Sequence, residues 1–178
     1  MWAQSLISSN LFGDAMRHVF FSFDWDDVWR VNQVRHSWVT KGSYTAAGFV
    51  DSAQIETLKR NTDLAIKRWI GKQMDGTSVP CVLIGSQTAN SRWVKYEIEQ
   101  SIEKGNGLLG VYIHNVKDRH GWTSTKGASP FRQSPINFTP TTNTNLVYPC
   151  CSYYDWVNDK GRENLGSWIE KAAQQAGR

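Results

Sequence analysis

Cysteine is scarce in this chain, and its placement argues against disulfide bonds. Three cysteines occur among 178 residues, and two of them, Cys150 and Cys151, are adjacent. A bridge between neighbours is strained and three is an odd number, so we expect no disulfide framework. The sequence therefore favours a reduced protein in the cytoplasm.

Long apolar runs are also missing. No stretch approaches the roughly 18 consecutive apolar residues that a membrane-spanning helix requires. Residues 1–16 mix polar side chains into their apolar positions and have no cationic start, which makes them a poor secretory signal. We therefore expect neither a membrane partner nor secretion.

Neither basic clusters nor metal-ligand clusters occur. The chain has 20 Lys and Arg against 16 Asp and Glu, a net charge of +4 that is not gathered into a basic run. This distribution argues against a nucleic-acid partner. The four histidines are scattered without zinc spacing, so we expect no metal site. They are His18, His36, His114 and His120.

Apolar residues make up 40% of the chain, enough for the core of one domain over residues 1–178. Short apolar runs predict buried strands at 18–23, 78–85 and 108–114. Helical spacing predicts one helix at about 26–39, one or two across 54–73, and one at about 89–104. This alternation predicts an α/β fold with a mainly parallel central sheet and helices on both faces.

The second half of the chain changes character. Residues 118–150 hold four of the five prolines, which predicts a long loop insertion near residues 115–146. The expected core covers about 17–115, the loop about 116–146, and a closing strand and helix about 146–176. A strand is expected at 146–148 and a brief one at 48–50.

The usual nucleotide-binding and hydrolase fingerprints are missing. No Gly-x-Gly-x-x-Gly, phosphate-binding Gly-Lys-Ser/Thr loop or Gly-x-Ser-x-Gly elbow occurs. What remains is Trp93 and Glu97, one turn apart on the helix after Gly85 and next to its predicted sheet-facing stripe. Glu97 has no cation at three or four residues' distance on that helix. Spacing alone leaves open that Glu97 is an ordinary solvated helix residue.

The exit of the first strand is a second candidate region. Ligands of open α/β sheets bind at the carboxyl ends of strands, near a change in strand order. Ser22, Phe23 and Asp24 lie at one such end and Ser86 at another. The alternative is that Asp24 and the carboxylates of residues 26–27 cap the next helix.

Several segments, in order, resemble one family over about two-thirds of the chain. They are Val19–Phe23, Asn32–Arg35, Ala65–Ile70, Val82–Ser86, Ser91–Glu99 and Gly107–His114, with the resemblance continuing to Phe131. The chain resembles the bacterial and archaeal TIR-like proteins, and among them the ThsB-type TIR proteins of the Thoeris anti-phage defence system. The resemblance implies a flavodoxin-like, three-layer fold.

The resemblance also implies an activity. Enzymatic members cleave the nicotinamide–ribose bond of NAD⁺, which is a substrate and not a cofactor, and Thoeris-type members make a cyclic ADP-ribose isomer. Trp93 and Glu97 match the family's Trp-x-x-x-Glu pattern, so Glu97 is the expected catalytic residue. Ser22, Phe23, Asp24, Ser86 and Trp93 are the expected substrate-binding residues.

The same resemblance implies partners, and the sequence also departs from the family's pattern at one segment. Members self-associate through TIR surfaces, here including the loop at 41–51, and their product activates a downstream effector. The acidic segment Asp24–Asp27 does not suit a diphosphate, which leaves N–H groups, Arg30 or Arg35 to bind it. A non-catalytic adaptor or NAD-binding module is the alternative reading.

Overall fold

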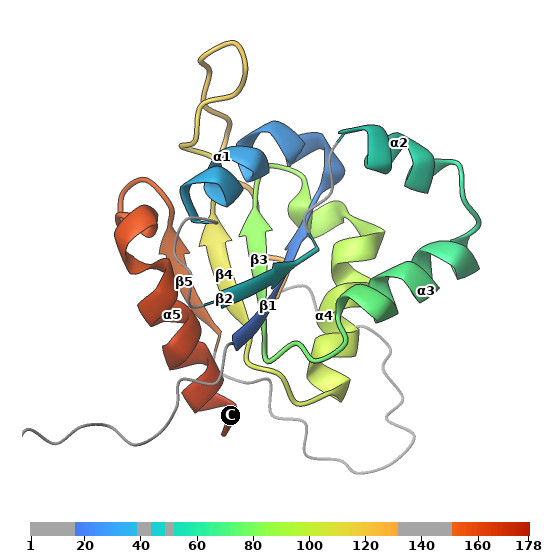
Figure 1. The fold of residues 1–178 in the computed structure, drawn as a ribbon. Helices are drawn as coiled ribbons and strands as arrows, with labels where there is room; N and C mark the ends of the chain where they lie inside the picture. The colour runs from blue at the N-terminus through green and yellow to red at the C-terminus, as the bar shows by residue number, and fades with distance from the viewer. Residues whose placement is uncertain (1–16, 39–43, 49–51, 132–150) are drawn as a thin grey trace, which may run out of the picture.

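The computed structural model describes residues 17–38, 44–48, 52–131 and 151–178 (Figure 1). The strands are Arg17–Phe23 (β1), Tyr44–Ala47 (β2), Val79–Ile84 (β3), Leu109–Tyr112 (β4) and Ser152–Asp155 (β5). The α-helices are Val28–Trp38 (α1), Ser52–Lys59 (α2), Asp63–Gln73 (α3), Arg92–Glu103 (α4) and Gly161–Gln175 (α5). Short 3₁₀ turns precede two of them, at Trp25–Asp27 (η1) and Thr88–Asn90 (η2).

The five described strands form one parallel sheet in the order β2-β1-β3-β4-β5. This is the flavodoxin-like order, and it confirms the predicted α/β class. The chain moves outward from β1 to β2, then returns past β1 to β3. The strand order therefore reverses between β1 and β3, where ligands of such sheets bind.

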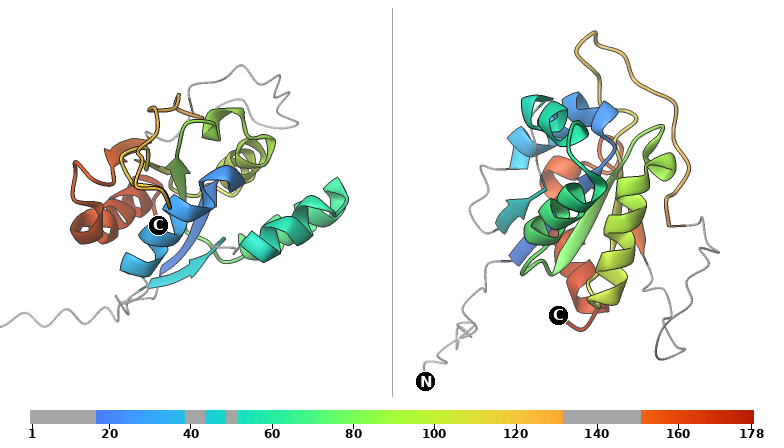
Figure 2. Two further views of the ribbon diagram at one scale, coloured as in Figure 1. Left: turned by 90° about the horizontal axis from the view of Figure 1, so that it is seen from above. Right: turned by 90° about the vertical axis from the view of Figure 1, so that its right-hand side faces the viewer.

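The helices cover both faces of this sheet. Seen from above, α1 and α4 lie on opposite sides of the strands (Figure 2). Side chains of α1 and α5 share one buried cluster with Val19, Phe21 and Phe23 of β1. Side chains of α3 pack with Phe20, and those of α4 pack with β3. Alternate residues of β1 thus point into different layers.

Continuous apolar sequence forms the central strands because both of their faces are covered. Every residue of β3 is buried, as are residues 19–23 of β1. The strands predicted at 18–23, 78–85 and 108–114 are confirmed as β1, β3 and β4. The region predicted to hold one or two helices across 54–73 contains two, α2 and α3.

One boundary differs from the prediction, and two predicted strands lie partly or wholly outside the described residues. In this region the structure describes β2 at 44–47, which ends at Gly48, a residue with a positive φ of 85°, whereas residues 49–50 of the strand expected at 48–50 lie outside the described residues. The helix expected from about 89 begins at Arg92, because η2 occupies 88–90. The strand expected at 146–148 falls outside the described residues, and the closing strand that the structure describes is β5.

No helix in the described parts of the chain combines the length and the apolar character needed to cross a bilayer.

Two glycines offer a test of this packing. A Cβ on Gly107, between α4 and β4, would lie 2.7 Å from the Ala172 carbonyl carbon in the α5 backbone. We expect Gly107→Ala to lower the free energy of unfolding by roughly 2–3 kcal/mol, since a helix backbone cannot move aside cheaply. Gly71→Ala is the control, because a Cβ there on α3 meets nothing within 4 Å.

We expect Gly71→Ala to stabilise the protein by about 0.5–1 kcal/mol through helix propensity. Urea unfolding of both variants measures the two changes. Equal stability of the two variants would show that the connection before β4 does not pack against α5 as described.

Candidate active site

A hydrogen bond between Ser22 and Glu97 joins the carboxyl end of β1 to α4. Ser22 Oγ donates to Glu97 Oε2 over 2.5 Å, although the residues lie 75 positions apart. Strand alternation explains this contact. Phe20 packs with α3, and Ser22, two residues later, points to the same face of the sheet.

Glu97 is buried, with 7% of its surface exposed. It occupies the side of α4 that packs on the sheet, beside the buried Val94 and Ile98. Ser101 Oγ donates to the Glu97 carbonyl oxygen over 2.6 Å, one turn further along the helix. The structure therefore rules out a solvated position for Glu97.

Burial without a cation changes the acidity of Glu97. Desolvation raises the pKa of its carboxyl from 4.5 to about 8, and the hydrogen bond from Ser22 opposes this rise only in part. Among the described residues, no cationic side chain forms an ion pair with it. The resting carboxyl is therefore largely protonated at neutral pH, and a cation placed beside it would favour its ionised form.

The Ser22–Glu97 pair lies where the strand order reverses. Ser22 is paired with Val82 of β3, and Phe23 with Leu83. Gly85 and Ser86 then follow the end of β3. The two strand ends that the sequence singled out are thus adjacent in the sheet.

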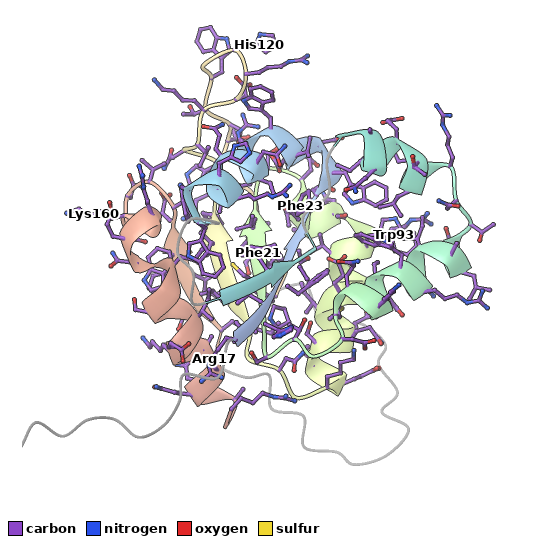
Figure 3. All side chains as sticks on the ribbon, in the orientation of Figure 1. Arg17, Phe21, Phe23, Trp93, His120 and Lys160 are labelled. Carbon is purple, nitrogen blue, oxygen red and sulfur yellow. The ribbon has the colours of Figure 1, made fainter. Side chains whose placement is uncertain are left out.

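The other predicted site residues occupy different surroundings. The Phe23 ring is buried in the cluster on the α1 and α5 face, opposite Ser22 (Figure 3). Asp24 Oδ1 accepts the backbone N–H of Asp26 over 3.1 Å, so it caps η1. Ser86 is half-buried beside the end of β3.

Trp93 begins the turn of α4 that precedes Glu97. Its partly buried ring packs against the cluster of Phe20, Ile66, Ile70 and Met74, on the side of α4 that faces α3 (Figure 3). The Arg92 guanidinium lies 4.5 Å from the ring centroid and forms two hydrogen bonds to Asp63, at 2.9 and 3.1 Å. These contacts fix the first turn of α4 against α3.

A charged network that the sequence did not predict lies on the other face. Arg30 contacts Asp27 at 3.3 Å and Asp118 at 3.5 Å. It also donates to the carbonyl oxygens of Val116, at 3.0 Å, and Trp122, at 3.3 Å. Arg30 is thus engaged by two carboxylates, which argues against its proposed role as a diphosphate ligand. One part of this network could have been found in the sequence, because Asp27 and Arg30 are three residues apart, a spacing at which opposite charges on a helix can pair.

The Asp27 side chain also lies against Gly85, directly after the end of β3. A Cβ on Gly85 would overlap the Asp27 carboxylate, so a larger residue there would displace that side chain. Desolvation raises the pKa of Asp27, while the Arg30 charge lowers it. No group of three potential metal-ligating His, Cys, Asp or Glu side chains gathers in the described part of the chain.

Comparison with known proteins identifies relatives. The family described as "Thoeris protein ThsB, TIR-like domain" matches residues 20–118, which include Ser22 and Glu97. A protein of Bacillus cereus (strain MSX-D12), named "Putative cyclic ADP-D-ribose synthase ThsB1", is 51% identical over 189 aligned residues. That alignment covers 86% of this chain and 98% of the relative.

The acidity of Glu97 predicts a pH-dependent stability. Between pH 4.5 and 8 the folded protein holds a proton on Glu97 that the unfolded chain has released, so stability should fall as pH rises. Glu97→Gln removes this titration and keeps an oxygen that can accept from Ser22. We expect wild type to lose roughly 3 kcal/mol relative to Glu97→Gln between pH 5 and pH 8.

Denaturant unfolding of both proteins between pH 5 and pH 8 measures this difference in stability. Glu99→Gln is the control, because the Glu99 side chain is only partly buried on the same helix. Parallel pH profiles for wild type and Glu97→Gln would contradict the burial of an uncompensated carboxyl.

Proposed function

The chain belongs to the ThsB-type TIR-like proteins of Thoeris systems, and we propose that it cleaves the nicotinamide–ribose bond of NAD⁺ with Glu97 as catalytic residue. The observation that carries this proposal is a buried carboxyl at the reversal of strand order, with no ion-pair partner in the part of the chain that the structure describes. The name of the 51% identical relative, "Putative cyclic ADP-D-ribose synthase ThsB1", points to the same chemistry.

The reaction needs a negative charge more than it needs a strong acid. Nicotinamide is already cationic in NAD⁺, and it leaves with the electron pair of the C–N bond. The ribose that remains carries an oxocarbenium-like positive charge. A desolvated carboxylate stabilises such a charge strongly, because little water screens the interaction.

The raised pKa of Glu97 fits this role. The neutral acid is the more stable form in the resting site, whereas a cationic nicotinamide riboside beside it lowers its pKa and favours the carboxylate. The proton that Glu97 loses passes to solvent as substrate binds. Ser22 then donates a hydrogen bond from its hydroxyl group to the carboxylate and holds it in position.

The fate of the ribosyl cation determines the product. Attack by water gives ADP-ribose, and attack by a nucleophile within the same molecule gives a cyclic ADP-ribose. We assign the cyclic product, in keeping with the name of the relative. Cyclisation requires that water be kept from the reacting carbon.

Partners complete the proposal. We propose that copies of the chain associate through TIR surfaces that include the loop at 41–51, most of which lies outside the described residues. We also propose that the nucleotide product activates a downstream effector in anti-phage defence. A non-catalytic adaptor would need no buried acid at residue 97.

Glu97→Gln tests the catalytic assignment. The variant keeps the shape and helix propensity of the residue, but it cannot supply the charge that the transition state requires. We expect nicotinamide release to fall at least ~100-fold, a barrier increase of about 3 kcal/mol. Nicotinamide and cyclic product are quantified by mass spectrometry, with pure protein and with lysate of infected cells expressing it.

Glu99→Gln is the matched control, since residue 99 lies two positions along α4 and is only partly buried. It should retain activity at equal amounts of soluble protein. Wild-type output from Glu97→Gln would refute the catalytic role and would favour the adaptor.

A further inference from the structure

The segment after β4 folds back against the end of β3. The Ser124 N–H donates to the His114 carbonyl oxygen over 2.9 Å. A Cβ on Gly127 would overlap the Gly85 carbonyl oxygen, so the two backbones are in close contact. Residues 124–131, which we term the return segment, are thus fixed beside the strand end that borders the candidate site.

Aromatic contacts fix the far end of the return segment. Ser129 Oγ and the Tyr153 hydroxyl lie 2.7 Å apart, and the Phe131 and Tyr153 ring centroids are 5.6 Å apart. Tyr153 in turn stacks on Tyr112 of β4, with ring centroids 6.2 Å apart. Contacts on both sides therefore restrain Lys126.

Lys126 places its ammonium group over the Tyr112 ring, 4.2 Å from the centroid. Tyr112 pairs with Ile84 of β3, and Ser22 pairs with Val82, two residues earlier on the same strand. Ser22, Val82, Ile84 and Tyr112 therefore face the same side of the sheet as Glu97. Two strand spacings and a two-residue offset separate the Ser22 and Tyr112 backbones by about 12 Å.

The partner of Lys126 is a weak one. A cation–π contact at an exposed site contributes only about 0.5–1 kcal/mol. Among the described residues, no carboxylate forms an ion pair with Lys126, whereas Arg30 is paired with Asp27 and Asp118. An anionic ligand at this edge of the sheet could therefore bind the Lys126 ammonium without breaking an ion pair.

We infer that Lys126 binds the diphosphate of NAD⁺. This inference rests on the proposed function, because it takes the nicotinamide riboside to lie beside Glu97. The rest of the dinucleotide then crosses the end of β3 toward Tyr112, where the return segment holds Lys126. The acidic segment after β1 repels the diphosphate from the opposite direction.

Equilibrium binding to Glu97→Gln protein tests the inference without turnover. Adding Lys126→Ala should raise the Kd for ADP-ribose and for NAD⁺ about tenfold, the loss expected for one charge-assisted contact. Nicotinamide riboside, which has no diphosphate, should bind equally to both proteins. Lys126→Arg should restore most of the affinity for ADP-ribose.

Lys117→Ala is the matched control, since Lys117 is an exposed lysine in the same connection after β4. ADP-ribose affinity that is equal in the Lys126→Ala and Lys117→Ala proteins would overturn the inference, as would undetectable binding to the parent protein. Weaker binding in Lys126→Ala, together with no turnover by wild type, would support the diphosphate contact and refute the proposed catalysis. The two claims can therefore fail separately.

Discussion

The site depends on one buried hydrogen bond, between Ser22 and Glu97. A carboxyl removed from water without a cation costs folding free energy, and one hydroxyl donor recovers only part of that cost. The protein lowers the cost by holding the neutral acid, which is what a pKa of about 8 describes. Because α4 must seat Glu97 against β1, the η2 turn, the Arg92–Asp63 pair and the packing of Trp93 all serve to position this helix.

Strand order separates two charged regions at the carboxyl edge of the sheet. On the α1 side, Asp27, Arg30 and Asp118 satisfy one another and connect η1 to the chain after β4. On the α4 side, the side-chain partner of the Glu97 carboxyl among the described residues is Ser22, and that of the Lys126 ammonium is an aromatic ring. The charges of Asp27, Arg30 and Asp118 are already paired and have a structural role. Glu97 and Lys126 can instead interact with a charged ligand. A dinucleotide that is cationic at one end and anionic in the middle complements that second arrangement.

The sequence was sufficient to predict the fold class and to single out Glu97 as the catalytic candidate. It was not sufficient to predict which side chains surround Glu97 or how deeply it is buried. Apolar runs and helical spacing locate β1, β3, β4 and the helices because burial on both faces dictates those patterns. Glu97 could be identified from its motif, but its burial depends on how far α4 rotates against β1, which spacing does not determine. The Arg30 network and the contact of Gly127 with Gly85 join residues about 90 and 42 positions apart, and no local pattern encodes such contacts.

The free-energy cost of burying Glu97 indicates that this residue has a functional role and not a structural one. Glutamine at this position would accept the same hydrogen bond from Ser22 and would carry no charge to desolvate, so folding alone favours the amide. Retaining an acid there lowers stability at neutral pH, and no described cation compensates for it. Such a cost is expected where a residue is needed in its ionised form during only part of a reaction. In the proposed reaction the positive charge moves from the nicotinamide ring to the ribose as the bond breaks, so a carboxylate beside the ribose stabilises the transition state more than it stabilises the bound substrate, and that difference accelerates bond cleavage.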